Sequence, residues 1–171
     1  MKDWLSRGVA MILLRSGPEE LRGDRTSLFT ALLCYLLAGA LLLGLRGEQA
    51  RILPILVLDL GIVLGFTVLA LRLAGRTARI PQTLEALWLV GALLSLAAVP
   101  LAPGAAGAGE EPTGPQAVAI TLSLVISFWS VAVMAHILRR ALEWPFHRAL
   151  ALAILYFLGN VVVHVQFFTN G

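Results

Sequence analysis

The sequence predicts an all-α membrane protein in which a short interfacial helix precedes five transmembrane helices. Hydrophobic residues make up 58% of the 171 residues and charged residues only 13%, whereas a soluble domain carries about 25% charged residues. Five apolar runs follow one another, each with the ~20 residues needed to cross about 30 Å of hydrocarbon. They are residues 26–45, 52–73, 84–102, 117–138 and 149–168.

The chain begins with a charged segment, residues 1–25, which we expect to be cytoplasmic or interfacial. Four apolar side chains can share one helical face: Trp4, Leu5, Val9 and Ile12. This predicts a short helix in the membrane interface, with Trp4 as its anchor. Residues 16–20 then indicate a helix stop and a new start, because Pro18 and two glutamates favour a first helical turn.

Residues 26–171 are expected to form a single transmembrane bundle, since a backbone in hydrocarbon must satisfy its own hydrogen bonds. The tight turn at 45–51 predicts that the first two helices are antiparallel neighbours. Residues 102–112, rich in glycine and alanine, predict a flexible spacer. Trp88 and Trp144 are expected in an inner aromatic belt, and the deeper Trp129 between helices.

The basic residues predict the orientation. Eleven of the 13 lie in the N-terminal segment and in the second and fourth gaps between apolar runs, which share one side of the membrane. The positive-inside rule makes that side cytoplasmic and the C-terminus periplasmic. The preference for arginine over lysine, with much alanine, leucine and glycine, is typical of a bacterial inner-membrane protein with a GC-rich genome. A nucleic-acid partner is not expected, because the arginines gather at membrane boundaries.

Polar side chains inside the apolar runs are the candidate site. Asp59 lies about 10 Å from the outer end of the second run, and a carboxylate at that depth needs a partner. Asn160 and His164 share a face of the fifth run at a similar depth, and Ser95 and Ser123 add to the same layer. Two interpretations stay open. One is a proton relay or small-ligand site, and the other is a structural hydrogen-bond cluster.

Other motifs point away from catalysis. Gly61 and Gly65 form a GxxxG pattern, which favours close helix packing within the bundle over dimerisation. His136 is expected to snorkel or cap a helix rather than to ligate haem. No cofactor or metal site is expected, because His and Cys residues lack metal-ligand spacing. No nucleophile with a neighbouring base can be identified, so an enzyme is not expected.

Two stretches resemble the Yip1 family. Residues 73–84, Leu-Ala-Gly-Arg-Thr-Ala-Arg-Ile-Pro-Gln-Thr-Leu, are similar to its second loop and third helix. Phe128-Trp129 and the later Arg148-Ala149-Leu150-Ala151 are similar to its fourth helix, loop and fifth helix. The resemblance implies five spans and a cytoplasmic N-terminus. The eukaryotic members bind Rab GTPases through a region with an Asp-Leu-Tyr-Gly-Pro stretch, which this chain lacks, so that function is not implied.

The leading functional hypothesis is a non-enzymatic, Yip1-like scaffold or assembly protein of the bacterial inner membrane. Its partners would be the lipid bilayer and either further copies of itself or other membrane subunits. The alternative is a small proton- or solute-handling transport protein that uses Asp59, Asn160 and His164. Polar groups connected to water would favour transport, whereas a dry and fully paired cluster would favour the scaffold.

Overall fold

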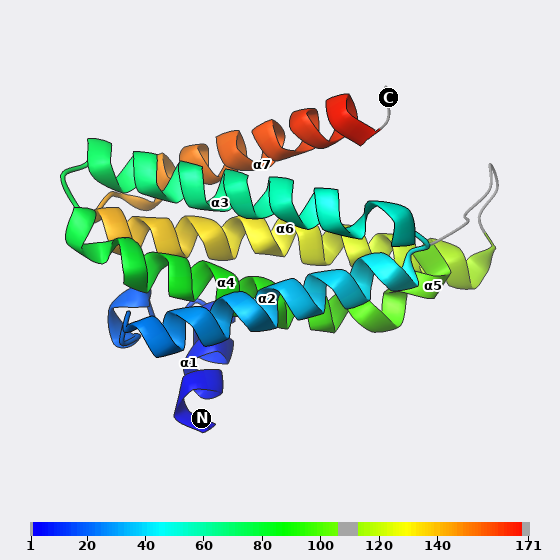
Figure 1. The fold of residues 1–171 in the computed structure, drawn as a ribbon, viewed down its shortest axis with the longest axis horizontal. Helices are drawn as coiled ribbons and strands as arrows, with labels where there is room; N and C mark the ends of the chain where they lie inside the picture. Colours follow the sequence, from blue (N-terminus) through cyan, green and yellow to red (C-terminus); the bar gives the residue numbers. More distant parts are fainter. Residues whose placement is uncertain (1, 106–112, 169–171) are drawn as a thin grey trace.

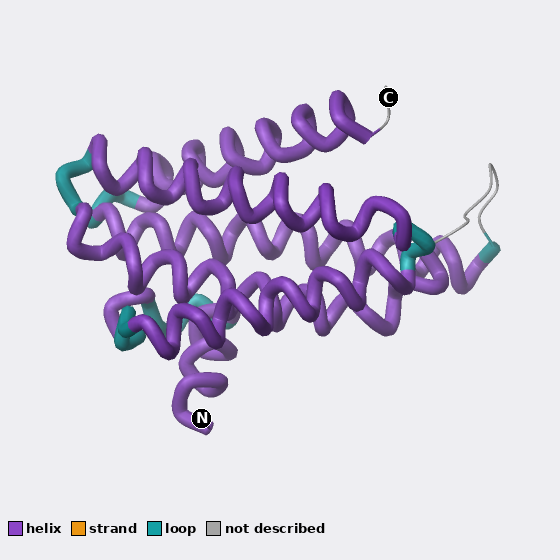
Figure 2. Tube along the Cα trace, viewed as in Figure 1, coloured by secondary structure: helices purple, strands orange, loops and turns teal. Residues whose placement is uncertain are grey.

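The computed structural model describes residues 2–105 and 113–168, and these are mostly helical, with short turns between the helices (Figures 1 and 2). Within those residues, five helices are long and apolar enough to cross a membrane. They are α2 (Arg25–Leu45), α3 (Ile52–Leu73), α4 (Ile80–Ala98), α6 (Gly114–Leu142) and α7 (Phe146–Phe168). The predicted all-α membrane class is therefore confirmed.

Short elements precede and connect these helices. They are α1 (Lys2–Ile12), the 3-10 turns η1 (Pro18–Glu20), η2 (Gln49–Arg51), η3 (Thr77–Arg79) and η4 (Val99–Leu101), and α5 (Ala102–Ala105). The new helical start predicted near Pro18 is thus one 3-10 turn. The predicted flexible spacer begins with α5, and its residues 106–112 lie outside the described part of the chain.

Three helices begin three or four residues before their apolar runs: α4, α6 and α7. α4 starts at Ile80, with Pro81 in its first turn, where a missing N–H costs little. α6 starts at Gly114, because Thr113 and Gln116 form a capping box ahead of the apolar run. The extensions of α4 and α6 are polar or proline-containing turns, which hydropathy by itself does not recognise as helix.

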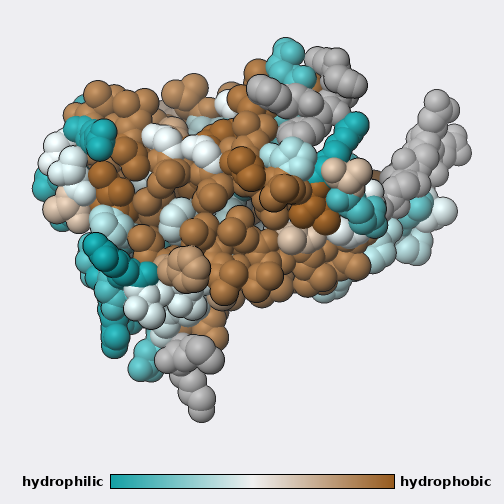
Figure 3. Space-filling view, viewed as in Figure 1, coloured by the Kyte–Doolittle hydropathy of each residue, from teal (hydrophilic) through white to brown (hydrophobic). Residues whose placement is uncertain are grey.

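The five long helices lie side by side and alternate in direction (Figure 1). The turns 74–79 and 143–145 and the N-terminal segment lie at one end of the bundle, here called the basic end. The turn 46–51 and α5 lie at the other, here called the opposite end. Figure 3 shows apolar side chains across the middle of one face and hydrophilic ones toward both ends of the bundle.

Small residues make the two closest helix seams. α2 contacts α3, as the turn between them predicts, but it packs mainly along α4. A Cβ added at Gly91 would lie 2.7 Å from the Tyr35 ring, so the ring rests directly on the α4 backbone. Between α6 and α7, four fully buried alanines allow close approach: Ala135, Ala141, Ala149 and Ala153.

The GxxxG motif corrects one prediction. Gly61 and Gly65 lie on the exposed face of α3, and a Cβ added at either would meet nothing within 4 Å. The motif therefore does not pack within the bundle. The packed face of α3 is instead formed by Val63, Thr67 and Leu71, because helix rotation turns these residues inward and the glycines outward.

The α1 helix is present as predicted, but it docks on the bundle. A Cβ added at Gly8 would lie 2.8 Å from Leu93 Cδ1 and 3.0 Å from Leu89 Cδ2, so α1 lies very close to α4. Met11 is fully buried in the same core cluster. Figure 1 shows α1 steeply inclined to the long helices, near the basic end.

Trp4 anchors α1 to protein rather than standing free in the interface. Its Nε1 donates to Glu85 Oε1 at 2.8 Å, and the backbone N–H of Gly23 donates to Glu85 Oε2, also at 2.8 Å. Glu85 lies in α4 and is 0% exposed. Both oxygens of a buried carboxyl group are thus satisfied by the N-terminal segment, which offsets its desolvation.

Two further side chains hold the N-terminal segment. Trp129 Nε1 donates to the carbonyl of Ile12 at 3.1 Å, so this half-exposed tryptophan bonds to α1 rather than filling a helix seam. His136 Nε2 lies 3.0 Å from the carbonyl of Ser16 and its side chain is buried. His136 therefore does not snorkel, which corrects the sequence interpretation.

Arginines at the basic end bind other helices. Arg79 Nη1 donates to the carbonyl of Arg140 at 2.8 Å and to that of Ala141 at 3.2 Å, so it caps the C-terminus of α6. Arg76 and Arg79 both pair with Glu143, whose left-handed φ of 57° ends the helix. These residues join the α3–α4 turn to the α6–α7 turn.

Candidate functional site

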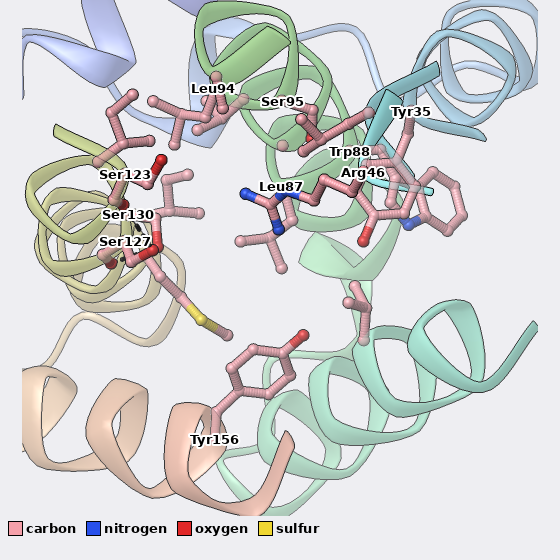
Figure 4. Close-up of a pocket in the computed structure, with 18 residues that line it drawn as sticks. Tyr35, Arg46, Leu87, Trp88, Leu94, Ser95, Ser123, Ser127, Ser130 and Tyr156 are labelled. Carbon is pink, nitrogen blue, oxygen red and sulfur yellow. Dashed lines mark hydrogen bonds between the residues drawn. The ribbon is translucent and has the colours of Figure 1, made fainter. Parts of the chain in front are cut away.

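A cavity of about 330 Å³ lies between α2, α4 and α6, with contributions from α3 and α7 (Figure 4). Its apolar walls come from Leu42, Val63, Leu87, Val90, Gly91, Leu94, Ala98, Ile126, Met134 and Ile137. Its polar lining comes from Tyr35, Arg46, Trp88, Ser95, Ser123, Ser127, Ser130 and Tyr156. Along α4 it extends from Leu87 to Ala98, about 16 Å of helix.

Two buried polar atoms on this wall have no hydrogen-bond partner. Among the described residues, three buried side-chain atoms are unpaired: Thr67 Oγ1, Trp88 Nε1 and Ser123 Oγ. Trp88 and Ser123 line the cavity, whereas Thr67 does not. Trp88 is 5% exposed, so the aromatic-belt prediction for it is wrong. An unpaired buried donor costs about 1–3 kcal/mol.

Three serines form a polar line on α6. Ser123, Ser127 and Ser130 are spaced by four and three residues, so they share one helical face. Ser127 Oγ donates to the carbonyl of Ser123 at 2.9 Å, and Ser130 Oγ donates to that of Ser127 at 2.7 Å. These two hydroxyl protons are occupied by backbone, and their oxygens can still accept hydrogen bonds.

Arg46 supplies the charge of the cavity. It caps the C-terminus of α2 through its backbone and lies at the opposite end of the bundle. Its side chain is exposed, and Figure 4 shows the guanidinium extending between the serines of α6 and Tyr156. No Asp or Glu is among the 18 residues that line the cavity, so the local charge is positive.

Asp59 lies beside the cavity in a paired cluster. Tyr35 Oη donates to Asp59 Oδ2, and Asn160 Nδ2 donates to Asp59 Oδ1 at 3.1 Å. His164 Nδ1 lies 2.9 Å from the carbonyl of Asn160, one turn away on α7. The proximity of Asp59 and Asn160 that their common depth predicts is therefore present, and the cluster links α2, α3 and α7.

The predicted five-residue layer divides into two groups. Asp59, Asn160 and His164 belong to the paired cluster, whereas Ser95 and Ser123 line the cavity. Tyr35 joins the groups, because its hydroxyl bonds to Asp59 while its side chain forms part of the cavity wall.

Several residues of the site escaped sequence reasoning. Tyr35 and Tyr156 lie in apolar runs, where a hydroxyl needing a partner was the available signal. Arg46 counted only as a loop charge. Glu85 lies inside the predicted run 84–102, but nothing in that run indicates its partners Trp4 and Gly23.

Metal ligands do not gather in the described part of the chain, where no three His, Cys, Asp or Glu side chains form a group. Comparisons of the chain with protein-family models, curated proteins and solved structures find no match.

Proposed function

We propose that this membrane protein is a non-enzymatic, solute-handling protein of a bacterial inner membrane. The observation that carries the proposal is the cavity with two unpaired buried polar atoms, Trp88 Nε1 and Ser123 Oγ. Each such atom costs free energy until a ligand or water pairs it, and these two belong to residues that line the same cavity. The concentration of arginine at the basic end supports a cytoplasmic N-terminus. Arg46 would then stand on the periplasmic side.

Asp59 has a structural role in this proposal. Tyr35 and Asn160 satisfy both of its oxygens, and a fully paired carboxyl group is the arrangement expected of a helix-linking cluster. The unpaired groups lie in the cavity instead. Solute would therefore contact the serines, Trp88 and Arg46, while Asp59 holds the surrounding helices together.

Cysteine labelling tests whether the cavity is reached from water. In a Cys34→Ala background, Ser95→Cys and Ser127→Cys should react with a small membrane-impermeant thiosulfonate added to the periplasmic side. Thr67→Cys is the matched control, because Thr67 is fully buried and does not line the cavity. If Ser95→Cys and Ser127→Cys are as inert as Thr67→Cys, the solute-handling proposal is wrong.

A second candidate is a Yip1-like assembly role, with a second copy or another membrane subunit as partner. The observation in its favour is a shallow groove on α3 lined by Gly61, Leu64, Gly65, Val68, Leu69 and Arg72. Small residues on an open face allow another helix to approach closely. Gly65→Leu should then shift the oligomeric state in mild detergent. Gly159→Leu, at an equally open glycine of α7, should not. If Gly65→Leu and Gly159→Leu have the same oligomeric state, the groove on α3 is not the interface.

A further inference from the structure

We infer that the cavity binds a small amphipathic anion, with its charged group on Arg46 and a hydrogen-bond acceptor on Trp88 Nε1. This inference rests on the proposed solute-handling function and names its ligand class. It follows from the charge, the unpaired donors and the size of the cavity, taken in turn.

The charge favours an anion. Arg46 is the one formally charged residue among those that line the cavity, and its guanidinium extends into it (Figure 4). A guanidinium carries five N–H donors in a planar fork that matches a carboxylate or phosphate group. A cationic solute would meet this group with no opposing carboxylate, because Asp59 is occupied by Tyr35 and Asn160.

The unpaired groups favour an acceptor at the other end of the ligand. Trp88 Nε1 can only donate, and the residue is 95% buried, being 5% exposed. Arg46 follows Leu45 at the opposite end, whereas Trp88 lies ten residues before Ala98, which also lines the cavity. The ligand we infer therefore carries an acceptor in addition to its anionic group. Ser123 Oγ, on the same cavity wall, offers another unpaired hydroxyl.

The remaining wall favours an apolar body and limits its size. Leucine, isoleucine, valine and methionine side chains make up most of the lining, so the middle of the ligand should be apolar. A volume of about 330 Å³ lies at the lower end of the ~300–1,000 Å³ range of small-molecule sites. A soluble anion with an acyl or aromatic body fits this volume, and we commit to it over a membrane lipid.

The test uses the full-length protein in phosphatidylcholine nanodiscs and 4-acetylbenzoate as probe, which combines a carboxylate, an apolar ring and a carbonyl acceptor. Saturable binding is expected. The Trp88 indole N–H resonance, assigned with Trp88→Phe, should move on binding. The Trp4 resonance should not, because its N–H is already bonded to Glu85. Two analogues should bind more weakly: the neutral 4-acetylbenzamide, which lacks the carboxylate, and 4-ethylbenzoate, which lacks the acetyl carbonyl.

Arg46→Gln should weaken binding of 4-acetylbenzoate at least about tenfold, as expected for loss of a charged hydrogen bond. The matched control is Arg51→Gln, in the same turn but absent from the cavity lining. It should leave the dissociation constant unchanged. Arg46→Lys should retain part of the affinity, because the charge remains and the planar fork is lost.

Four results would overturn the inference. Three are absence of saturable binding, equal weakening by Arg46→Gln and Arg51→Gln, and an unmoved Trp88 resonance in the bound state. The fourth is a shift of the Trp88 resonance in phosphatidylglycerol nanodiscs without probe, which would assign the site to a lipid headgroup. Inorganic phosphate should bind weakly, since it has no apolar body. If these tests fail while Ser95→Cys and Ser127→Cys label from water, the ligand class is wrong and the solute-handling proposal stands.

Discussion

At the scale of single residues, two tryptophans of α1 and α4 differ in one hydrogen bond. Trp4 Nε1 donates to Glu85, whereas Trp88 Nε1 has no partner. Replacement by phenylalanine, which has no N–H, therefore has different consequences at the two positions. At position 4 it leaves an oxygen of the buried Glu85 carboxyl group unsatisfied, and at position 88 it removes a donor that was already unsatisfied.

Trp4→Phe should lower the free energy of unfolding by about 1–3 kcal/mol, the cost of stranding a buried acceptor. Trp88→Phe should cost less than that, because the lost N–H had no bond and the residue borders an existing cavity. Thermal unfolding in mild detergent measures both. Equal destabilisation would contradict the assigned roles of the two indoles.

Asp59 allows a second prediction at this scale. Asp59→Asn should change stability by less than about 1 kcal/mol, because an amide can accept from Asn160 and donate to the Tyr35 oxygen. Asp59→Leu should be clearly worse, since it strands both partners. Solvent denaturation of the two variants separates these cases, and a severe loss with Asp59→Asn would refute the structural role.

At the scale of elements, α1 is held by close contact as well as by hydrogen bonds. Gly8 lies against Leu89 and Leu93, so a branched side chain at this position must push the helix away from α4. Trp129 and His136 then lose the carbonyls of Ile12 and Ser16 that they contact.

Gly8→Val should therefore release α1, which should red-shift the Trp4 emission and speed tryptic cleavage at Arg15. Ser6→Val is the control, because Ser6 lies on the exposed face of the same helix. It should leave both measurements near wild type. Slow cleavage in Gly8→Val would show that the contact with α4 tolerates a larger side chain.

A glycine pair tests the α2–α4 seam. Gly91→Ala should destabilise the protein by roughly 1–3 kcal/mol through overpacking against the Tyr35 ring. Gly65→Ala, where nothing lies within 4 Å, should be neutral or stabilising by up to about 1 kcal/mol, because alanine is the better helix former. Thermal unfolding should show a loss of stability for Gly91→Ala alone, and equal losses in the two variants would argue against the close α2–α4 seam.

At the scale of the whole molecule, the five helices and the arginine distribution predict one orientation. In a Cys34→Ala background, Asn170→Cys should react with an impermeant maleimide from the periplasmic side, and Thr77→Cys should react only after the cells are opened. The reason is that arginine-rich segments are retained in the cytoplasm. Labelling of Thr77→Cys in intact cells would show that the predicted orientation is wrong.

The way the helices pack explains which parts of the candidate site could be predicted from the sequence. Depth along a helix follows from residue counting, so the closeness of Asp59 and Asn160 was predictable. Depth says nothing about direction, and this is why Ser95 and Ser123 turned out to face a cavity instead of Asp59. The role of Arg46 depends on a long side chain bending back into the bundle, which residue spacing does not encode.

The sequence by itself determined the five long apolar helices and the gathering of basic residues at one end of the bundle. These properties are local, because a backbone in hydrocarbon must bond to itself and an apolar run of given length can cross only once. Only the tertiary structure decided which faces meet. It turned Gly61 and Gly65 outward, bound Glu85 to Trp4 and enclosed Trp88 beside a cavity. These outcomes depend on the rotation of each helix about its axis, which its neighbours set and its own hydropathy leaves open.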